Sequence, residues 1–214
     1  MNIAKHLFGL VGAALAVSSQ AAILTEGFDN LGTSGWTLTN NSSPADQNWF
    51  QGNAGVFSSQ AGAADAYAAA NFNSAQFGAG SIDNWLISPV LTLGGVSVLT
   101  FYTRTEDVDG FSDGIEVRFS FGSSADTSSF TTVVGASVGN YPHDWTLVAL
   151  ALPSAATGRI AFRYLVADAS LANYIGVDTV SVVAAAPPVP EPSTYALMAL
   201  GVAGLAALRR RHTA

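Results

Sequence analysis

The sequence predicts an all-β fold, a two-sheet jelly-roll-like sandwich, flanked by an N-terminal signal helix and a C-terminal hydrophobic helix. Residues 115–121 alternate apolar and polar side chains without a break, which is typical of a strand with one buried face. Gly, Ser, Asn, Asp and Pro cluster between such runs, as turns require. Between the two ends the sequence shows little helical periodicity and no repeat at a fixed period.

About ten short runs with strand character follow one another along the middle of the chain. With turn residues between them, they favour a sandwich or jelly roll. About 165 residues remain between the two ends, enough for one domain with a core that needs neither disulfides nor metals. The expected strands are residues 22–28, 36–39, 49–51, 67–71, 85–93, 98–104, 115–121, 130–134, 144–150, 159–166 and 174–183.

Residues 1–21 are predicted to form a secretory signal peptide. Lys5 gives a positive start, and residues 7–17 form an apolar run that is too short to span a bilayer. Small residues stand at the −3 and −1 positions for cleavage after Ala21, although cleavage one residue later is nearly as plausible. We therefore expect the Sec translocon and signal peptidase as partners, and an exported domain over residues 22–183.

The C-terminal part combines a linker, a short apolar run and a basic end. Residues 184–188, Ala-Ala-Ala-Pro-Pro, are expected to form an extended linker. The apolar residues 195–208 would cover about 21 Å as a helix, less than the hydrocarbon core of about 30 Å, which favours a temporary hold over a lasting anchor. The arginines after this run would stay in the cytoplasm. The residues that frame the run are Pro190, Glu191, Pro192, Arg209, Arg210 and Arg211.

This ending, residues 189–211, resembles the PEP-CTERM sorting signal of Gram-negative bacteria, in which a Pro-Glu-Pro motif, a short transmembrane helix and a basic cluster follow one another. The resemblance implies recognition by an exosortase, a membrane-embedded protease-like enzyme that cuts near the motif. The chain would then be anchored transiently in the inner membrane and released to the cell surface or an extracellular polysaccharide matrix. A permanent single-span anchor is the alternative.

The middle of the chain carries landmarks in a recognisable order. They include Gly27–Asn30, Gly35-Trp36, Trp49–Asn53, Trp85–Pro89, Phe101–Arg104, Gly158–Tyr164 and Tyr174–Asp178. Their order resembles the choice-of-anchor J domain over nearly all of residues 23–183, and is more distantly similar to MAM and cleaved-adhesin domains. The resemblance implies a jelly-roll sandwich used in adhesion and recognition.

Charge and composition exclude several classes of function. The chain has a net charge of −7 and no cysteine, so thiol nucleophiles and thiolate metal sites are excluded. Between residues 22 and 188 there are 14 acidic residues against four arginines and no lysine, a net charge of −10. Such a surface repels nucleic acid and anionic lipid, whereas it could attract divalent cations or basic partners. Solubility alone is the simpler explanation.

A cation site is the first candidate for chemistry. Asp178 is expected to share a strand face with Val180 and Val182, so that its carboxylate approaches the core near Glu26 of the first strand. A buried carboxylate is costly unless it is paired, and calcium would satisfy it through an oxygen shell. Related jelly-roll families carry a calcium near their first and last strands, so the resemblance implies Asp29 and Asp178 as ligands, with Glu26 weaker. Pairing with Arg159 or Arg163, or a bulge that turns the acids outward, is the alternative.

Four other features are weaker candidates. The acidic residues 106–114 miss the EF-hand spacing and favour a solvated loop. His143 stands beside Asp144, but no Gly-x-Ser-x-Gly elbow accompanies it, so a surface role is expected. Among 14 acids, nothing singles out a hydrolytic pair. The four tryptophans are expected in the core, although exposed ones could stack on sugar rings; they are Trp36, Trp49, Trp85 and Trp145.

The sequence therefore predicts a non-enzymatic surface or extracellular-matrix protein, sorted by an exosortase, that acts in adhesion or in matrix or biofilm assembly. It singles out no catalytic and no cofactor-binding residue beyond a possible structural calcium. A carbohydrate-binding module for extracellular polysaccharide is the alternative, and a solvent-facing row of aromatic side chains would favour it. A secreted hydrolase with an unrecognised site is the third possibility, and a cleft with two converging carboxylates would favour that.

Overall fold

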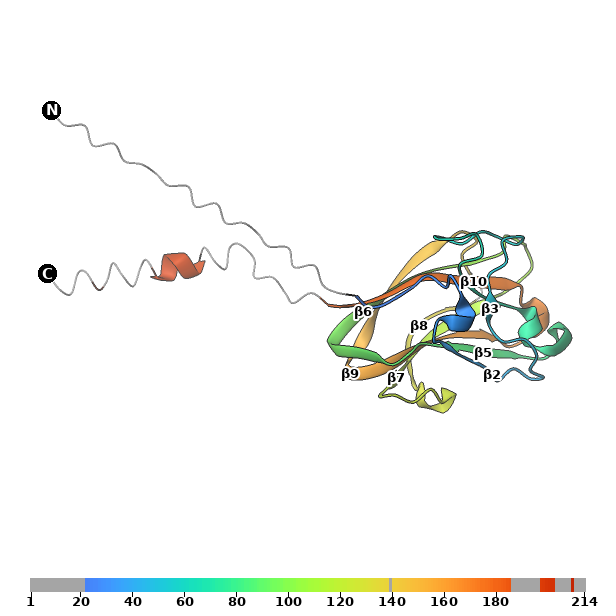
Figure 1. Cartoon of the computed structure of the whole chain (residues 1–214), viewed down its shortest axis with the longest axis horizontal. Helices are drawn as coiled ribbons and strands as arrows, with labels where there is room; N and C mark the ends of the chain where they lie inside the picture. Colours follow the sequence, from blue (N-terminus) through green and yellow to red (C-terminus); the bar gives the residue numbers. More distant parts are fainter. Residues whose placement is uncertain (1–21, 139, 186–196, 203–208, 210–214) are drawn as a thin grey trace, which may run out of the picture.

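The computed structural model describes residues 22–138, 140–185, 197–202 and 209 (Figure 1). The predicted signal peptide, residues 1–21, lies outside the described residues. Most of the predicted sorting residues lie outside them too, namely Pro190, Glu191, Pro192, Arg210 and Arg211. Residues 197–202 are helical, and none of the helices in the described part has the length and hydrophobicity that a membrane crossing needs.

The regular structure of residues 22–185 consists of ten strands and five short 3-10 helices. The strands are β1 (Ala22–Glu26), β2 (Thr37–Asn40), β3 (Phe50–Gln51), β4 (Ala68–Asn71), β5 (Ile82–Ile87), β6 (Leu91–Thr105), β7 (Gly114–Phe121), β8 (Thr132–Val138), β9 (Thr146–Val166) and β10 (Tyr174–Ala184). The 3-10 helices are η1 (Leu31–Thr33), η2 (Phe72–Ser74), η3 (Gln76–Gly78), η4 (Thr127–Ser129) and η5 (Ala169–Leu171).

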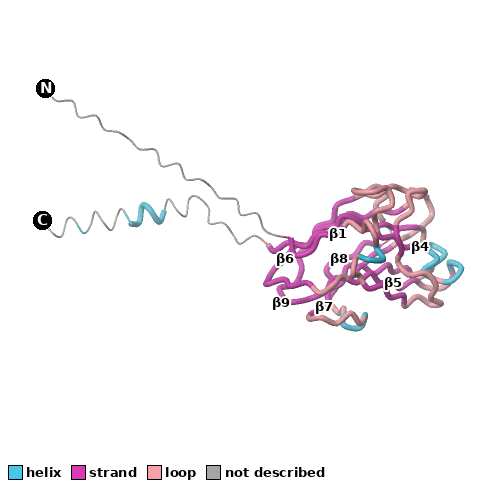
Figure 2. The backbone as a smooth tube through the Cα atoms, in the orientation of Figure 1, coloured by secondary structure: helices cyan, strands magenta, loops and turns pink. Residues whose placement is uncertain are grey.

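All strands belong to one antiparallel hydrogen-bonded sheet that curls over on itself. The main path runs β2-β5-β9-β6-β10-β4-β3, while β1 pairs with β10 and β7 pairs with both β8 and β9. Figures 1 and 2 show the result as two layers, with β10 in one and β2, β5 and β7 in the other. The mostly-β prediction is confirmed, but the two predicted sheets are joined through β9.

Strand β9 explains this difference. Its first half pairs with β6 up to Gly158, and its second half lies between β5 and β7. The separate strands expected at residues 144–150 and 159–166 are therefore one strand of 21 residues. Turn residues between the two predicted strands suggested a break. The strand continues through them because β6 is long enough to pair with β9 as far as Gly158.

The predicted strand at residues 85–93 is instead divided between β5 and β6. Pro89 lies between them, and proline has no N–H to continue the ladder. Within β6, Gly94 and Gly95 have φ values of +65° and +142°, and the register with β9 shifts at the same place. Glycine tolerates such angles, so the strand can bend there as the sheet curls.

The hydrophobic core lies between the two layers of the curled sheet. Trp36 is stacked on Phe162, with ring centroids 5.9 Å apart, and Phe28 meets the edge of Trp36 at 5.3 Å. Phe101 packs edge-on against Phe162 at 4.8 Å. These residues come from the N-terminal segment, β6 and β9, so the core joins distant parts of the chain.

Candidate functional site

Strand β10 is irregular at Asp178, the strongest predicted cation ligand. Its pairing with β6 shifts between Asp178 and Ser181, and Thr179 has a φ of +49°, which is strained for a β-branched residue. Val177 and Val180 both pack in the core on the two sides of this bulge. Asp178 therefore lies on the opposite face, and the prediction that it shares a face with Val180 is wrong because the bulge changes the alternation.

The Asp178 carboxylate is fully buried, and backbone amides surround it. Its Oδ2 accepts hydrogen bonds from the N–H groups of Gln60 at 2.8 Å and Ala61 at 3.1 Å, and its Oδ1 accepts one from Thr179. Burial raises the pKa of Asp178, and these three hydrogen bonds oppose that rise. The carboxylate thus fastens the chain around residue 60 onto the outer face of β10.

The other two predicted ligands lie near the same corner of the fold. Glu26 pairs with Val180 across β1 and β10, and its Oε1 accepts the N–H of Phe28 at 2.7 Å. Asp29 faces Gly62, where an added methyl group would lie 3.2 Å from its Oδ1. Within the described residues, no three acids, histidines or cysteines are close enough to hold a metal ion. Calcium at this corner stays a prediction.

An open cavity of about 470 Å³ adjoins this corner. Two carboxylates, Asp29 and Asp65, line it together with the side chain of Gln51. Gln51 Nε2 donates to the carbonyl groups of Phe28 at 2.8 Å and Asp65 at 2.6 Å, while its Oε1 accepts the N–H of Leu31 at 2.8 Å. This glutamine joins the segments after β1 and before β4, so the corner is held by the chain's own groups.

Residues 52–67 cover the outer face of β4 and β10, and their aromatic side chains pack there with two others, from β10 and from the segment before β9. We call Phe57, Tyr67, Trp145 and Tyr174 the covered aromatic cluster. Phe57 lies 5.1 Å from Tyr67 and 5.2 Å from Tyr174, and the guanidinium of Arg104 stands 4.4 Å from its ring centroid. The Tyr67 and Tyr174 hydroxyls are 3.1 Å apart, and Trp145 Nε1 donates to the carbonyl of Ser58 at 2.9 Å.

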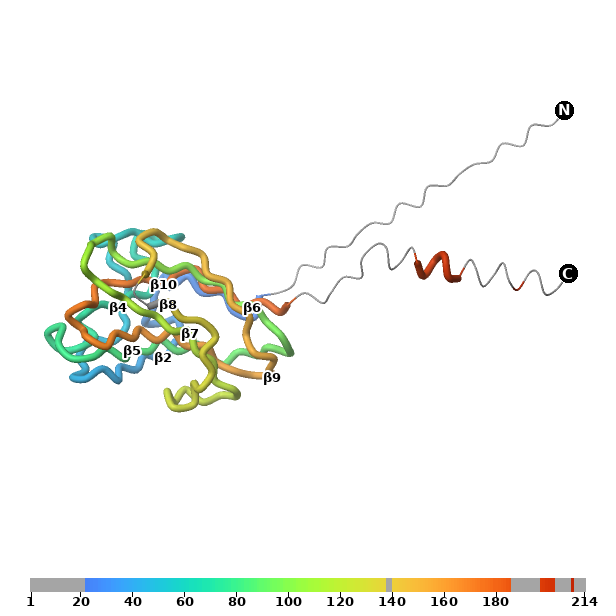
Figure 3. Tube along the Cα trace, turned by 180° about the vertical axis from the view of Figure 1, so that it is seen from behind, coloured from blue at the N-terminus to red at the C-terminus, as the bar shows by residue number. Residues whose placement is uncertain are grey.

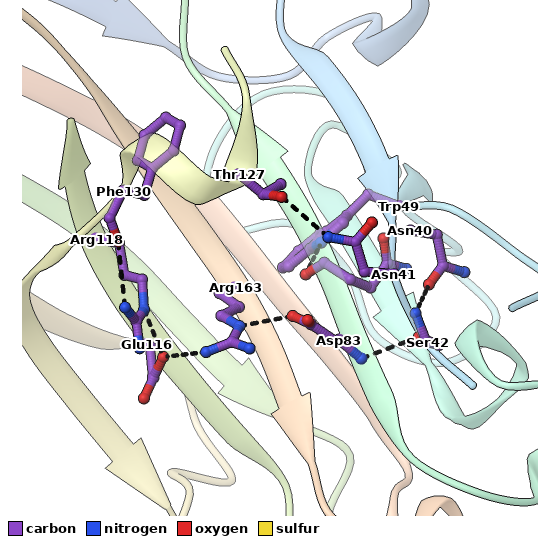
Figure 4. A network of polar contacts seen from close by, with 11 residues as sticks. Asn40, Asn41, Ser42, Trp49, Asp83, Glu116, Arg118, Thr127, Phe130 and Arg163 are labelled. Atoms are coloured by element: carbon purple, nitrogen blue, oxygen red, sulfur yellow. Dashed lines mark hydrogen bonds and ion pairs between the residues drawn. The ribbon is translucent and has the colours of Figure 1, made fainter. Parts of the chain in front are cut away.

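A charged network crosses the outer face of β5, β9 and β7 (Figure 4). Arg163 bonds Asp83 at 2.6 Å and Glu116 at 3.0 Å, and Glu116 also bonds Arg118 at 2.7 Å. We call these four residues the ion-pair ladder. Arg163 also lies 4.8 Å from the centroid of the Trp85 ring, which it covers. Arg163 thus pairs with acids on neighbouring strands rather than with the predicted cation ligands.

The ion-pair ladder shifts the pKa of two of its members, Glu116 and Arg163. Burial alone would raise the pKa of Glu116, but hydrogen bonds from Arg118 and Arg163 lower it below its usual value. The pKa of Arg163 is raised, chiefly by its hydrogen bond to Asp83. Because every member has a partner of opposite charge, the ladder holds three strands together rather than offering a free acid or base.

The acidic segment at residues 106–114 is an exposed loop over residues 107–111, as its composition predicts, but its end at Asp113 is buried. Asp113 is buried, where it accepts hydrogen bonds from Thr105 Oγ1 at 2.6 Å, from the Tyr164 hydroxyl at 2.5 Å and from the N–H of Asn173 at 2.9 Å. Burial and the carboxylate together raise the pKa of Tyr164 well above its ordinary value. The Asp113 carboxylate thus joins β6, β9 and the residue before β10 through three hydrogen bonds, which is a structural role.

His143 lies at the surface. Its Nδ1 is 3.0 Å from Oδ1 of Asp107, and both side chains are largely exposed. The sequence suggested Asp144 as the partner of His143. The structure instead brings it against Asp107, which lies in the connection between β6 and β7. Surface ion pairs of this kind contribute little to stability.

The aromatic residues that face solvent are phenylalanines rather than tryptophans. Trp36, Trp49 and Trp85 are buried, and Trp145 is partly buried in the covered aromatic cluster. Among the described residues, the exposed rings belong to Phe72, Phe77, Phe111 and Phe121. Sequence reasoning named only the tryptophans as candidate sugar platforms and so missed these phenylalanines; the signal available was Phe77 next to glycine in a run of small and polar residues.

The family model of the PEP-CTERM protein-sorting motif matches residues 188–211. No curated protein matches the chain. Among solved structures, the chain is similar to the K3 cleaved adhesin domain of Lys-gingipain from Porphyromonas gingivalis, with 25% identity and a TM-score of 0.61, covering 78% of this chain and 100% of that domain. The K1 domain of the same protein gives 24% identity and a TM-score of 0.62, covering 76% of this chain and 98% of that domain.

The K2 cleaved adhesin domain of Lys-gingipain is also similar, with 25% identity and a TM-score of 0.56 over 74% of this chain and 96% of that domain. The C-terminus thus carries a PEP-CTERM sorting motif, which implies an exported, exosortase-sorted cell-surface protein. The described sandwich has the fold of cleaved adhesin domains.

Proposed function

We propose that this chain is a non-enzymatic surface protein whose sandwich acts in adhesion or in the assembly of an extracellular or biofilm matrix. One observation carries the proposal: an adhesin-like sandwich is followed by an exosortase sorting motif in the same chain. The sandwich is of the choice-of-anchor J kind, as its landmarks suggest. Its place after export is the cell surface or the polysaccharide matrix around it.

The bonding of the ionisable groups supports a binding role over catalysis. Asp178, Asp113 and Glu116 each bond two or more donors from their own chain. General acid–base work needs a group that exchanges a proton with a substrate, and a carboxylate held in this way is occupied. These acids therefore act in the structure, and recognition falls to the exposed surface.

The two ends complete the proposal. Residues 1–21 act as the signal peptide for Sec export, residues 22–183 form the ectodomain, and residues 184–188 act as the linker, whose first residue, Ala184, still pairs in β10. The tail, residues 189–211, holds the chain in the inner membrane until exosortase cuts near its Pro-Glu-Pro motif. Arg209, Arg210 and Arg211 keep the end of this tail on the cytoplasmic side.

Sorting is tested by replacing these three arginines with glutamine in the full chain. We expect the variant to stay in the membrane fraction or to be degraded, because the positive end no longer fixes the orientation of the tail. Fractionation and immunoblotting measure this outcome. Normal surface release of the variant would contradict the role of the tail.

Adhesion is tested by comparing attachment of the producing cells with and without the gene. We expect deletion to lower attachment to a surface or to an isolated matrix, and the restored wild-type chain to return it. A chain that reaches the surface but whose loss changes neither attachment nor matrix mass would overturn the adhesive role.

A further inference from the structure

Three phenylalanines gather around a cavity at one end of the sandwich. The cavity has a volume of about 270 Å³, and we call it the distal pocket. It is formed where η2 and η3, the segment after β6 and η5 meet. The lining residues are Phe72, Phe77, Gly78, Phe111, Ala169, Ser170, Ala172 and Asn173.

The side chain of Phe77 is exposed to solvent, and its backbone is strained. Its side chain is 88% exposed, and its φ of +58° lies in the left-handed region that side chains other than glycine rarely adopt. Gly78 follows with a φ of +64° and lies so close to Phe72 that an added methyl group would be 3.2 Å from that ring. An exposed phenylalanine gains no stability from core packing or from contact with water, so nothing within the fold offsets the strain at Phe77. Uncompensated strain of this kind is characteristic of functional sites.

Asn173 adds an unsatisfied polar group to the pocket. Its main chain is fixed, because its N–H donates to Asp113 and its carbonyl accepts the N–H of Phe72 at 3.0 Å. The residue is only 7% exposed, and its buried Nδ2 has no hydrogen-bond partner among the described residues. A buried donor without an acceptor is unfavourable, and a turn of the Asn173 side chain toward the pocket that this residue lines would let an oxygen of a bound ligand satisfy it.

Aromatic rings beside an amide donor suit a sugar ring. A pyranose presents C–H groups on its faces, which pack on aromatic rings, and hydroxyl groups at its edge, which accept and donate hydrogen bonds. Ser170 supplies a second polar group at the same wall. A cavity of about 270 Å³ admits a compact ring better than an extended acyl chain or a helix.

Charge narrows the class of sugar. Residues 22–188 carry 14 acidic residues and four arginines, and none of the arginines lines the distal pocket. An anionic polysaccharide would be repelled by this field. We propose that the distal pocket binds one pyranose ring of a neutral extracellular polysaccharide, an inference that rests on the proposed adhesive function and names its partner.

The position of the pocket fits this role. Figure 1 shows the two ends of the described sandwich leaving beside β6, whereas the teal 3-10 helices η2 and η3 lie at the far end, and Figure 3 shows the same from behind. A chain held by its C-terminal tail would therefore present the pocket away from the point of attachment. Phe121 is an exposed phenylalanine on β7 that does not line the pocket, which makes it a matched control.

The test is affinity electrophoresis of the full chain, purified in mild detergent, through gels that contain neutral β-glucan, galactan or mannan, with alginate as the anionic comparison. We expect retardation by at least one neutral polysaccharide and none by alginate. Phe77→Ala should weaken binding about tenfold, since stacking on an aromatic side chain contributes this much in other ligand systems. Phe121→Ala should bind like the wild type.

Asn173→Ala is the second variant. Because the main chain of Asn173 makes the structural bonds and its Nδ2 makes none, we expect the melting temperature to stay near the wild-type value while binding falls. No binding to any neutral polysaccharide, or equal binding by Phe77→Ala, would overturn the proposal. If Phe77→Ala kept its sugar binding but no longer bound a protein that the wild type binds, the proposal would also be overturned, and the pocket would be assigned to a protein partner.

Failure of this inference can be told apart from failure of the proposed function. Cells that display the Phe77→Ala chain and still attach normally would remove the pocket from adhesion and leave the adhesive role intact. Wild-type cells that show no surface chain would overturn the proposed function itself, whatever the gels show.

Discussion

The covered aromatic cluster and the distal pocket lie close together in sequence but have opposite surroundings. In the covered cluster, Phe57 and Tyr67 are buried and the Tyr67 hydroxyl bonds the carbonyl groups of Asn53 and Phe57 at 2.9 and 3.0 Å. In the distal pocket, Phe77 is exposed and the side-chain Nδ2 of Asn173 has no hydrogen-bond partner among the described residues. The contrast teaches that aromatic content alone does not mark a binding site, and the proposed sugar site rests instead on exposed rings beside an unsatisfied polar group.

The backbone explains why the two regions differ. Gly176 of β10 leaves room for the covered cluster, since an added methyl group there would lie 2.9 to 3.1 Å from Trp145, Phe57 and Tyr67. The strand thus accepts the rings directly onto its face. At Phe77, the left-handed backbone directs the ring away from the sheet instead.

The largest expected effect breaks the covered cluster. Phe57→Ala should lower the free energy of unfolding by about 3–4 kcal/mol, because it removes a buried ring and leaves a cavity beside Tyr67 and Arg104. Urea unfolding followed by tryptophan fluorescence measures the loss. Phe77→Ala is the matched control and should change stability by less than about 0.5 kcal/mol. Equal losses for the two variants would abolish the distinction between the regions.

The ion-pair ladder extends the comparison to partnered charges. Glu116→Gln should cost about 1–2 kcal/mol at pH 7, because it removes the negative charge between Arg118 and Arg163. The pKa of Glu116 is lowered in the folded state, so its contribution is present above the ordinary pKa of about 4.3 and is lost as the pH falls below it. Thermal melting from pH 7 to pH 3 should show a smaller acid loss in the variant than in the wild type. The exposed Asp46→Asn serves as the control, and an unchanged acid profile in Glu116→Gln would contradict the ladder's role.

A smaller effect concerns Tyr67. Burial raises its pKa above the ordinary value of about 10, so the folded state keeps the proton that the unfolded state releases, and stability falls as the pH rises above about 10. Tyr67→Phe should cost about 1 kcal/mol at pH 7 through lost hydrogen bonds and should weaken the alkaline loss. Melting between pH 8 and 11 checks both, with Tyr102→Phe on β6 for comparison. An alkaline loss of wild-type size in Tyr67→Phe would assign that loss to other buried tyrosines.

Sequence reasoning located the strands well where the alternation was strong, as at residues 115–121, which correspond to β7. It failed where long-range pairing decides the structure. Residues 144–150 and 159–166 join into β9 because β6 pairs along the strand as far as Gly158 and β5 and β7 pair with the residues that follow, and no local sequence pattern reveals these neighbours. Turn composition likewise hid the buried Asp113, whose donors come from three separate segments of the chain.

The candidate site was harder to predict than the fold. Period-two reasoning placed Asp178 with the core residues, but a single bulge with Thr179 in the left-handed region reversed its face. The exposure of Phe77 depends on backbone angles that a phenylalanine seldom adopts, so its sequence gives little warning. Both positions depart from local rules, as functional or strained positions often do.

The smallest expected effect is the response to calcium, which tests whether the corner near the covered cluster is itself a binding site. The Asp178 carboxylate already accepts three N–H groups, and Gly62 lies against Asp29, so a cation must share ligands that the chain uses. We therefore expect 5 mM calcium to raise stability by less than about 1 kcal/mol over EDTA, through preferential binding to the folded state. Asp29→Asn should remove this gain, whereas Asp46→Asn should keep it. A wild-type melting temperature that is identical in calcium and in EDTA would remove the calcium site, and the corner would then be held by hydrogen bonds alone, like the rest of the covered region.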